Sequence, residues 1–201
     1  SSRKRHTRLT DVTGVQTWDL PILLYPAPAV LVTSADVNGK PNIATVAWTG
    51  NVCSDPPMLS ISLRPERYSH TLIRASGEFV VNVPAADHIR WVDYCGVVSG
   101  RDVDKFAATN FTPGKAKSVR PPILVECPIN IECKVRRTLE LGSHTLFLAE
   151  VMAVQVSAAL IAKSGRFAIE RAGLAAYVHG GYFALGEHLG LFGFSIRKQR
   201  K

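Results

Sequence analysis

An arginine, several hydroxyl groups and a predicted helix start come together within residues 62–71, and this combination favours anion binding. The polar side chains are Ser62, Arg64, Ser69, His70 and Thr71. Free backbone N–H groups and the positive end of the helix dipole would face the same point as the guanidinium and the hydroxyls. Such a site suits a phosphate best.

A flat aromatic surface lies just upstream, at Trp48. The residues that follow it are rich in turn formers, Gly50 and Asn51 among them, so we predict a loop from Trp48 to Pro57. Backbone N–H groups at the start of this loop would be free to bind the edge of a ring. A ligand with a planar ring at one end and a phosphate at the other would fit the whole segment.

The elements that must position these groups follow from local patterns. Apolar and polar residues alternate in Met58–Arg64, which is the period of a half-buried strand. Pro65 ends this strand, and Ser69 is the predicted N-cap of a helix that Gly77 terminates. Strand–turn–helix units of this kind are common in proteins without a ligand, so spacing alone leaves a purely structural interpretation open.

Short strands dominate the rest of the chain, and Asn38-Gly39 is a strong hairpin signal between two of them. Predicted strands cover residues 29–37, 42–48, 58–64 and 79–83, then a pair within 123–156 and a last pair within 160–169 and 174–184. Short helices are predicted over 87–98 and 104–108. Many short strands with few helices predict a closed or nearly closed antiparallel barrel.

Several other classes of protein are disfavoured by missing motifs. The chain has no G-x-G-x-x-G after a strand, no G-x-x-x-x-G-K-[ST] and no G-x-S-x-G. Its four cysteines lack the paired spacing of a zinc site, so no metal site is predicted. With no apolar run long enough to cross a membrane and no signal peptide at its start, we expect a cytoplasmic protein with reduced, mostly buried thiols.

The net charge of +8 is located at the two ends of the chain. Residues 1–8 hold four basic residues and residues 197–201 hold another four; without these eight, 16 basic residues remain against 16 acidic ones. We therefore predict a basic flexible segment over 1–20, one folded domain over 21–196 and a basic tail over 197–201. A neutral body makes sequence-specific nucleic-acid binding unlikely to be its function.

The segment NIATVAWTGNVCSDPPMLSISLRPERYSHTLI resembles the signature region of the flavin-reductase-like family with the FMN-binding split barrel, in particular its flavoredoxin-like branch. Further similar stretches, in the order of the family, are YPAPAVLVTS, GEFVVNVP, VDKFAATNFTP, GSHTLFLAEV and YFALGEHLGLFGFS. The likeness runs from about Tyr25 to Ser195. No single motif is decisive, but the ordered set is specific.

This resemblance implies a mainly β (α+β) fold: an antiparallel split β-barrel with a few short helices, which binds FMN and forms a homodimer. It implies an NAD(P)H-dependent FMN oxidoreductase, a flavin reductase, in which hydride passes from NADH or NADPH to the flavin. Electrons would leave with free reduced FMN or pass to a protein acceptor, such as a monooxygenase partner. Two alternatives stay open: a flavoredoxin-like FMN electron carrier reduced by a protein partner, and a barrel binding module without flavin turnover.

The resemblance also assigns candidate site residues. His144, in a Gly-x-His motif, is the candidate catalytic residue near flavin and nicotinamide; Ser143 replaces the Asp that is common there, so an obligatory acid role is not favoured. The candidate cofactor-binding residues are Ala47, Trp48, Thr49, Gly50, Asn51, Cys53, Ser54, Ser62, Leu63, Arg64, Tyr68, Ser69, His70, Thr71 and Tyr182. Cys53 could equally be a small packing residue. Lys105 lies in a stretch that resembles the family and could approach the ligand, but a solvated side chain is the favoured interpretation.

Overall fold

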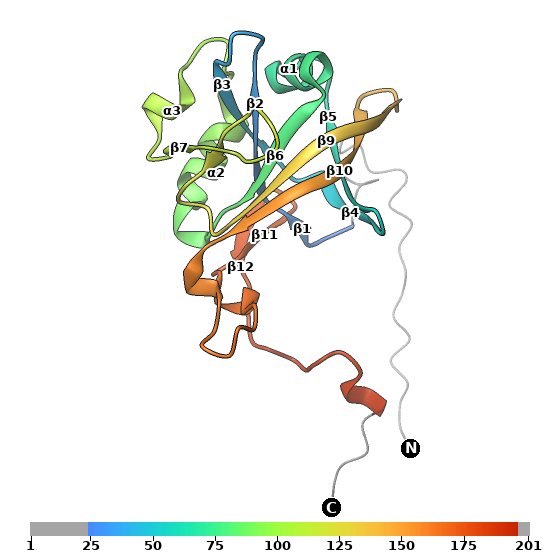
Figure 1. Cartoon of the computed structure of the whole chain (residues 1–201), viewed down its shortest axis with the longest axis vertical. Helices are drawn as coiled ribbons and strands as arrows, with labels where there is room; N and C mark the ends of the chain where they lie inside the picture. The colour runs from blue at the N-terminus through green and yellow to red at the C-terminus, as the bar shows by residue number, and fades with distance from the viewer. Residues whose placement is uncertain (1–23, 197–201) are drawn as a thin grey trace, which may run out of the picture.

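The computed structural model describes residues 24–196, and a seven-stranded antiparallel sheet forms the body of the molecule (Figure 1). Its strand order is β3-β2-β6-β9-β10-β5-β4. The strands are β2 (Val30–Ala35), β3 (Pro41–Val46), β4 (Thr49–Ser54), β5 (Pro57–Leu63), β6 (Glu78–Val83), β9 (Ile129–Glu140) and β10 (Thr145–Val156). The predicted segment 1–20 and the tail 197–201 lie outside the described residues.

Alternating side chains of this curled sheet pack chiefly in two hydrophobic cores, and a third, smaller cluster holds Ile129, Leu160 and Ala172. Val30 and Val32 of β2 pack in the first core with Ile61, Phe79 and Phe147. Leu31 of the same strand points the other way into the second core, so β2 is buried on both faces. The predicted alternation of β5 is confirmed, because Leu59, Ile61 and Leu63 are all buried.

Three short α-helices cover the sheet. They are α1 (Tyr68–Ser76), α2 (Ile89–Val97) and α3 (Lys105–Ala108), and a 3-10 turn, η1 (Ala86–His88), precedes α2. Val92 and Cys95 of α2 pack in the second core against Leu31 and Ile43. The Thr45 hydroxyl donates a hydrogen bond to the Val92 carbonyl and so joins α2 to β3. No described helix is long and apolar enough to cross a membrane.

The chain continues into a small second sheet of order β1-β11-β12, formed by β1 (Ala27–Pro28), β11 (Ala175–Val178) and β12 (Gly181–Ala184). The predicted last strand pair is therefore correct for 174–184 but wrong for 160–169. That segment forms the 3-10 turns η2 (Ala158–Leu160) and η3 (Ile169–Arg171), linked by one bridge between Ile161 and Phe167. A tight turn with Gly165 in the left-handed region leaves too few residues for two strands.

The predicted loop from Trp48 to Pro57 is also wrong, since most of it is strand β4. β4 pairs antiparallel with β5, and the turn is confined to Asp55 and Pro56. A register shift between Asn51 and Cys53 marks an irregularity in the ladder. Hydrogen bonds to β5 hold this segment as a strand although its residues favour turns. Pairing with a neighbouring strand can outweigh the weak intrinsic β-propensity of such residues.

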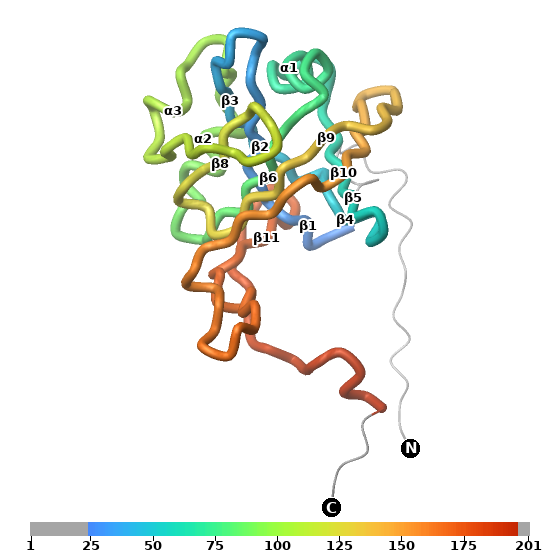
Figure 2. Tube along the Cα trace, viewed as in Figure 1, coloured from blue at the N-terminus to red at the C-terminus, as the bar shows by residue number. Residues whose placement is uncertain are grey.

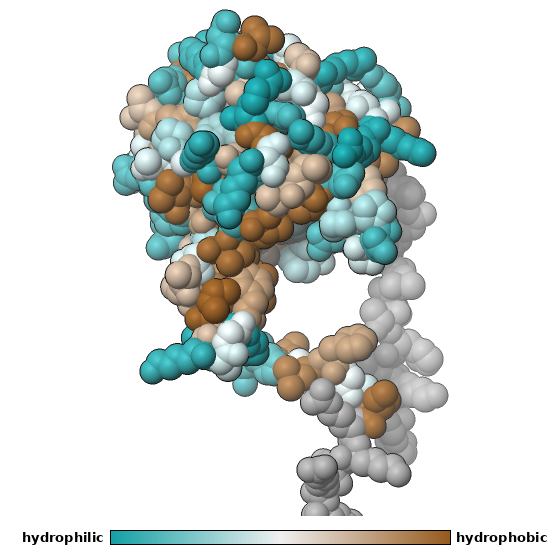
Figure 3. Space-filling view, viewed as in Figure 1, coloured by the Kyte–Doolittle hydropathy of each residue, from teal (hydrophilic) through white to brown (hydrophobic). Residues whose placement is uncertain are grey.

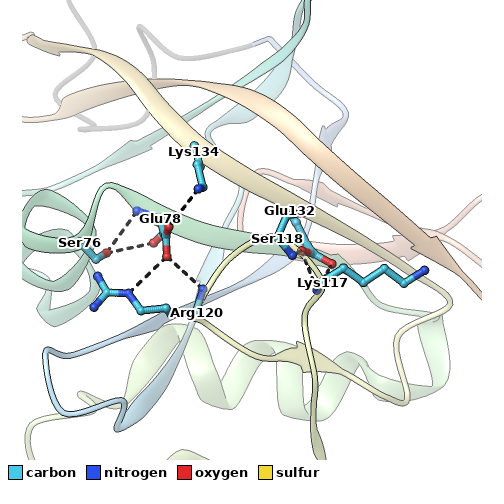
Figure 4. A network of polar contacts seen from close by, with 7 residues as sticks. All are labelled: Ser76, Glu78, Lys117, Ser118, Arg120, Glu132 and Lys134. Carbon is cyan, nitrogen blue, oxygen red and sulfur yellow. Dashed lines mark hydrogen bonds and ion pairs between the residues drawn. The ribbon is translucent and has the colours of Figure 1, made fainter.

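A buried carboxylate fixes the long connection between α3 and β9, which contains only the two-residue strands β7 (Pro113–Gly114) and β8 (Ile123–Leu124). Glu132 of β9 is fully buried and accepts hydrogen bonds from the backbone N–H of Lys117 at 2.9 Å and from that of Ser118 (Figure 4). Gln155 of β10 donates another. The connection is thereby attached to the centre of the sheet. The path of this connection between α3 and β9 can be followed in Figure 2.

Candidate functional site

A cavity of about 870 Å³ lies between β3, the end of β5, the start of α1 and the end of α2. Ligand pockets for small molecules typically measure about 300–1,000 Å³. Its lining is Ala29, Asn42, Ala44, Thr45, Val46, Ala47, Trp48, Ser62, Leu63, Arg64, Glu66, Arg67, Tyr68, Ser69, Asp93, Cys95, Gly96, Val97, Val98, Ser99, Gly100, Arg101, Asp102, Lys105, His144, Tyr177 and Tyr182. A smaller cavity of about 340 Å³, lined by 24–28 and 47–49, shares Ala47 and Trp48 with it.

Three exposed arginines stand at this cavity, where β5 passes into α1. Arg64 lies 3.7 Å from the Glu66 carboxylate, and the two side chains are largely solvated. Arg101 donates to the Glu66 backbone carbonyl at 2.9 Å and lies over the Tyr68 ring. Arg67 donates to the Gly96 carbonyl at 3.4 Å. Asp93 and Asp102 also belong to the lining, so with Lys105 four cationic side chains face three carboxylates, a small positive excess that suits an anionic ligand.

The start of α1 differs in detail from the prediction. The helix begins at Tyr68 with Arg67 as its N-cap, so the assignment of Ser69 as N-cap is wrong. The Ser69 hydroxyl instead accepts a hydrogen bond from the Asn42 side-chain amide at 2.7 Å and stays in the cavity wall. Gly77 does end the helix, in the left-handed conformation at φ 68°.

Lys105 is buried, which corrects the expectation of a solvated side chain. It is only 4% exposed, and its Nζ donates to the Ile43 carbonyl and to the Cys95 carbonyl, both at 2.7 Å. Asp104 caps the short helix that carries it by accepting from the N–H groups of Phe106 and Ala107. Because α3 lies against β3, the lysine stem points inward, and Lys105 is part of the cavity lining.

Aromatic rings line another part of the cavity. Trp48 and His144 lie nearly parallel, with ring centroids 6.5 Å apart and an interplanar angle of 10°. The Ser62 N–H donates to the Trp48 carbonyl at 2.8 Å, which fixes the tryptophan to β5. Tyr177 and Tyr182 meet edge to face at 5.6 Å. Flat surfaces of this kind suit a planar heterocycle.

Two titratable side chains in the lining of the cavity, His144 and Tyr182, have shifted pKa values. Burial lowers the pKa of His144, and the Arg64 guanidinium lowers it further, so the neutral imidazole is favoured near neutral pH. The Tyr182 hydroxyl donates to the Asp93 carboxylate at 3.2 Å. Burial, together with that carboxylate, raises the pKa of Tyr182 to about 12.

The cavity brings together nine of the sequence-predicted site residues and leaves seven outside its lining. Inside are Ala47, Trp48, Ser62, Leu63, Arg64, Tyr68, Ser69, His144 and Tyr182. Outside are Thr49, which lines the smaller cavity, and Gly50, Asn51, Cys53, Ser54, His70 and Thr71. Gly50, Asn51, Cys53 and Ser54 of β4 are exposed, as is Thr71. His70 is buried and lies 3.0 Å from the Thr145 hydroxyl.

Sequence reasoning did not select several residues of the lining. These residues come from three parts of the chain that only the fold brings together: Asn42, Arg67, and the stretch 93–101 with Asp93, residues 96–100 and Arg101. Arg67 was detectable, because it lies in the same RPERYS stretch as Arg64 and Ser69. Asn42 and Arg101 carried no local signal.

Comparison with known proteins agrees with this geometry. The profile of the flavin reductase-like domain family matches residues 22–186. The flavoredoxin of Desulfovibrio vulgaris (Miyazaki F) is 32% identical, with a TM-score of 0.83 over 94% of this chain and 100% of that one. An uncharacterised protein of Archaeoglobus fulgidus is 36% identical over 131 residues, 65% of this chain and 73% of its own length.

A third relative has a described activity. The reductase component of the 4-nitrophenol 4-monooxygenase/4-nitrocatechol 2-monooxygenase of Rhodococcus opacus is 28% identical over 137 residues, 64% of this chain and 66% of its own. The mainly β fold with few short helices matches a protein of Shewanella frigidimarina that is described as having a split barrel domain, with 18% identity and a TM-score of 0.74 over 82% of this chain and 85% of that one. From its fold, and from a family profile that covers most of its length, the chain belongs to the flavin reductase-like domain family, with the FMN-binding split-barrel fold.

Proposed function

We propose that this protein binds FMN in the 870 Å³ cavity and catalyses hydride transfer from NADH or NADPH to the flavin. The single observation that supports this most is the pairing, in one cavity, of a positive end and an aromatic wall. Arg64, Arg67 and Arg101 supply the charge that a terminal phosphate needs. Trp48 and Tyr182 supply flat surfaces for a fused ring.

The residues present fit this cofactor in chemistry as well as in size. Bound FMN would supply the two-electron redox chemistry, while the protein supplies position and polarity. The Ser62 and Ser69 hydroxyls and the Arg64 guanidinium would hold ribityl and phosphate oxygens. The backbone N–H groups of Thr49, Gly50 and Asn51 stay candidates for the pyrimidine edge, although these residues lie outside the lining of the cavity.

His144 has a position that suits a neighbour of the nicotinamide. It is half-buried, parallel to Trp48 and held by a 2.9 Å contact between its Nδ1 and the Ser143 hydroxyl. Hydride delivery needs no proton donor in the transferring step, so a neutral imidazole is compatible with it. We assign His144 to positioning the nicotinamide rather than to acid catalysis.

The test is an absorption spectrum of the purified protein with FMN, followed by anaerobic addition of NADH and, separately, of NADPH. A flavin reductase bleaches the flavin band within seconds and, in air, oxidises nicotinamide continuously when FMN is added. Failure of FMN to bind, seen as an unchanged melting temperature at saturating FMN, contradicts the proposal, because a ligand of the native state must raise it. That outcome would favour a barrel binding module without flavin turnover.

A second candidate function is an FMN electron carrier that a protein donor reduces. The observation in its favour is the 32% identity with a flavoredoxin along 94% of this chain. The anaerobic experiment separates the two candidates. A carrier binds FMN tightly but bleaches slowly with both nicotinamides, whereas a reductase bleaches rapidly with at least one.

We also propose that the protein is a homodimer whose C-terminal arm, Leu189–Ile196, covers a second copy. The arm leaves the body of the molecule, as Figures 1 and 3 show, and within the described residues each of its large apolar side chains is at least 60% exposed. Phe192 is fully exposed and Leu189 is 90% exposed. An apolar run of this size in water is characteristic of an interface. Sedimentation should give twice the 21.9 kDa mass of one chain.

A further inference from the structure

The sequence predicts His70 among the cofactor-binding residues, yet the structure buries it outside the lining of the cavity. His70 is 6% exposed, and the residue before it, Ser69, does belong to the lining. The ring nitrogen Nε2 of His70 lies 3.0 Å from the hydroxyl of Thr145, which is fully buried. Because a buried polar group that loses its partner is costly, this contact fixes the two residues relative to each other.

Thr145 is also attached to the other end of the same segment. It is the first residue of β10 and pairs with Leu63, the last residue of β5, from which the chain runs through residues 64–67 into α1. Segment 64–69 is therefore anchored on Thr145 at both ends, by strand pairing before it and by the His70 contact after it. The residues of this segment that line the cavity are Arg64, Glu66, Arg67, Tyr68 and Ser69.

Thr145 directly follows His144 along the chain. The His144 ring lines the cavity and lies nearly parallel to that of Trp48. Because consecutive residues share a rigid peptide unit, whatever holds Thr145 also limits where the backbone of His144 can lie. The contact between His70 and Thr145 thus connects the cationic segment 64–69 with the aromatic part of the cavity.

We propose that His70 and Thr145 are positioning residues of the flavin site, which hold segment 64–69 and His144 in the arrangement that FMN binding requires. This inference rests on the proposed FMN site. The rival explanation is packing alone, since the His70 ring meets the Phe147 ring edge to face, with centroids 5.4 Å apart. Thr145 separates the two explanations, because its hydroxyl contacts His70 through a hydrogen bond whereas its methyl group can only pack.

The uncharged form of His70 is compatible with this contact. Burial lowers the pKa of His70 and the Arg74 guanidinium lowers it further, while Glu140 and Glu66 act in the opposite direction. A neutral imidazole has one nitrogen that donates and one that accepts, so either tautomer can form a hydrogen bond with a hydroxyl. The contact with Thr145 therefore needs no change of protonation near neutral pH.

The experiment compares Thr145→Val, which removes the hydroxyl and keeps the shape, with Thr145→Ser, which keeps the hydroxyl and removes the methyl group. The full chain is titrated with FMN and with riboflavin, which has the same ring and ribityl chain but no phosphate. Thr145→Val should weaken FMN binding about three- to tenfold, as expected for one lost hydrogen bond, and leave riboflavin affinity within about twofold. Thr145→Ser should bind both flavins as wild type does.

A second readout, the titration of His144, needs no bound flavin. Histidine Cε1 proton resonances followed over a pH series measure it. Thr145→Val should free the His144 ring from burial and from Arg64, the two causes that lower its pKa, so its titration should move to higher pH. Thr33→Val is the matched control, because Thr33 is also fully buried and its hydroxyl donates to the Pro122 carbonyl outside the cavity lining. It should change neither the flavin affinities nor the His144 titration.

Equal weakening of FMN and riboflavin in Thr145→Val overturns the inference, and so does a Thr145→Ser variant that is perturbed as strongly, because both results are those of packing. An unmoved His144 titration in Thr145→Val overturns it as well. Wild type should show a nuclear Overhauser effect between the His70 ring and the Thr145 methyl group, and its absence overturns the inference even where the variants do not fold. Wild type that binds neither flavin overturns the proposed function and this inference with it, whereas the other outcomes overturn the inference alone.

Discussion

Arg64 faces the cavity and, after burial, is the second cause of the lowered pKa of its neighbour His144. Its guanidinium lowers the pKa of His144, as does burial. Replacing Arg64 with alanine should therefore raise the pKa of His144 and shift its titration towards higher pH. Histidine Cε1 proton resonances followed over a pH series would measure this change. A His144 titration that does not move would place the two side chains farther apart in solution.

The same Arg64→Ala substitution should weaken FMN binding. A charge-assisted hydrogen bond is lost, and because more than half of this side chain is exposed, we expect the low end of the usual range, about 1.5 kcal/mol or close to tenfold in Kd. Quenching of flavin fluorescence measures the affinity. Arg166→Ala is the control, since Arg166 pairs with Glu170 on the surface away from the cavity lining. Equal affinities for wild type and Arg64→Ala would remove Arg64 from the phosphate subsite.

His144→Ala should separate binding from turnover. Loss of the ring that lies parallel to Trp48 should slow NAD(P)H oxidation, while FMN affinity changes little, because the phosphate contacts are intact. Stopped-flow reduction at several nicotinamide concentrations and a separate FMN titration make the comparison. Parallel losses in both measurements would show that His144 supports the flavin rather than the nicotinamide.

Individual side chains were the hardest feature to predict from the sequence. Arg64 and Ser69 carried a local signal, because one ends an alternating strand and the other stands at a helix start. Lys105 did not, since a lysine in a short helix is normally solvated, and only the packing of α3 on β3 buries it. Asn42 and Arg101 enter the site through tertiary contacts that a linear pattern does not contain.

At the scale of elements, the contact between the end of α2 and β3 closes one side of the cavity. A Cβ on Gly100 would lie 1.8 Å from the Asn42 side-chain oxygen, so Asn42 would have to move and release Ser69. Gly100→Ala should destabilise the fold by about 1–3 kcal/mol and weaken FMN binding. Urea denaturation and an FMN titration test both effects. Gly186→Ala, where nothing lies within 4 Å of the added carbon, should change neither.

Glu132 has a comparable role for the connection between α3 and β9. Glu132 now accepts from the N–H groups of Lys117 and Ser118 (Figure 4) and also from the Gln155 side-chain amide. In Glu132→Gln, the new side-chain amide cannot accept all of these hydrogen bonds. Buried donors without partners should lower the free energy of unfolding by about 2 kcal/mol. Hydrogen exchange should accelerate at 115–120 before the rest of the protein. A variant as stable as wild type would mean that water replaces the lost acceptors.

Elements whose residues alternate regularly between apolar and polar were predicted well. Elements that exist only because they form hydrogen bonds with a neighbouring strand were not. β5 and the hairpin at Asn38-Gly39 are present because alternation and turn chemistry act locally. β4 was missed because its residues favour turns, and only its hydrogen bonds to β5 make it a strand. The predicted start of α1 was displaced by two residues, from Arg67 to Ser69, and the Ser69 hydroxyl accepts a hydrogen bond from Asn42 of a distant strand.

For the whole molecule, the fold class followed from the number of short strands, and the sequence resemblance specified a split barrel. These patterns did not predict that the C-terminal arm extends away from the barrel. Residues 185–196 lie beyond β12, where they bury none of their large apolar side chains in the body. A single chain gains no hydrophobic stabilisation from such an exposed arm, and the proposed dimer, in which a second copy covers the arm, would account for its composition.

Replacing Phe192 and Phe194 together with serine should therefore weaken self-association. Sedimentation equilibrium over a range of concentrations should give a dimer for wild type and a shift towards the 21.9 kDa monomer for the double variant. Val37→Ser is the control, because Val37 is also exposed and apolar but lies in the turn between β2 and β3, far along the chain from the arm. Identical dissociation constants for wild type and the double variant would exclude the arm from the interface, and a monomer at every concentration would exclude the dimer itself.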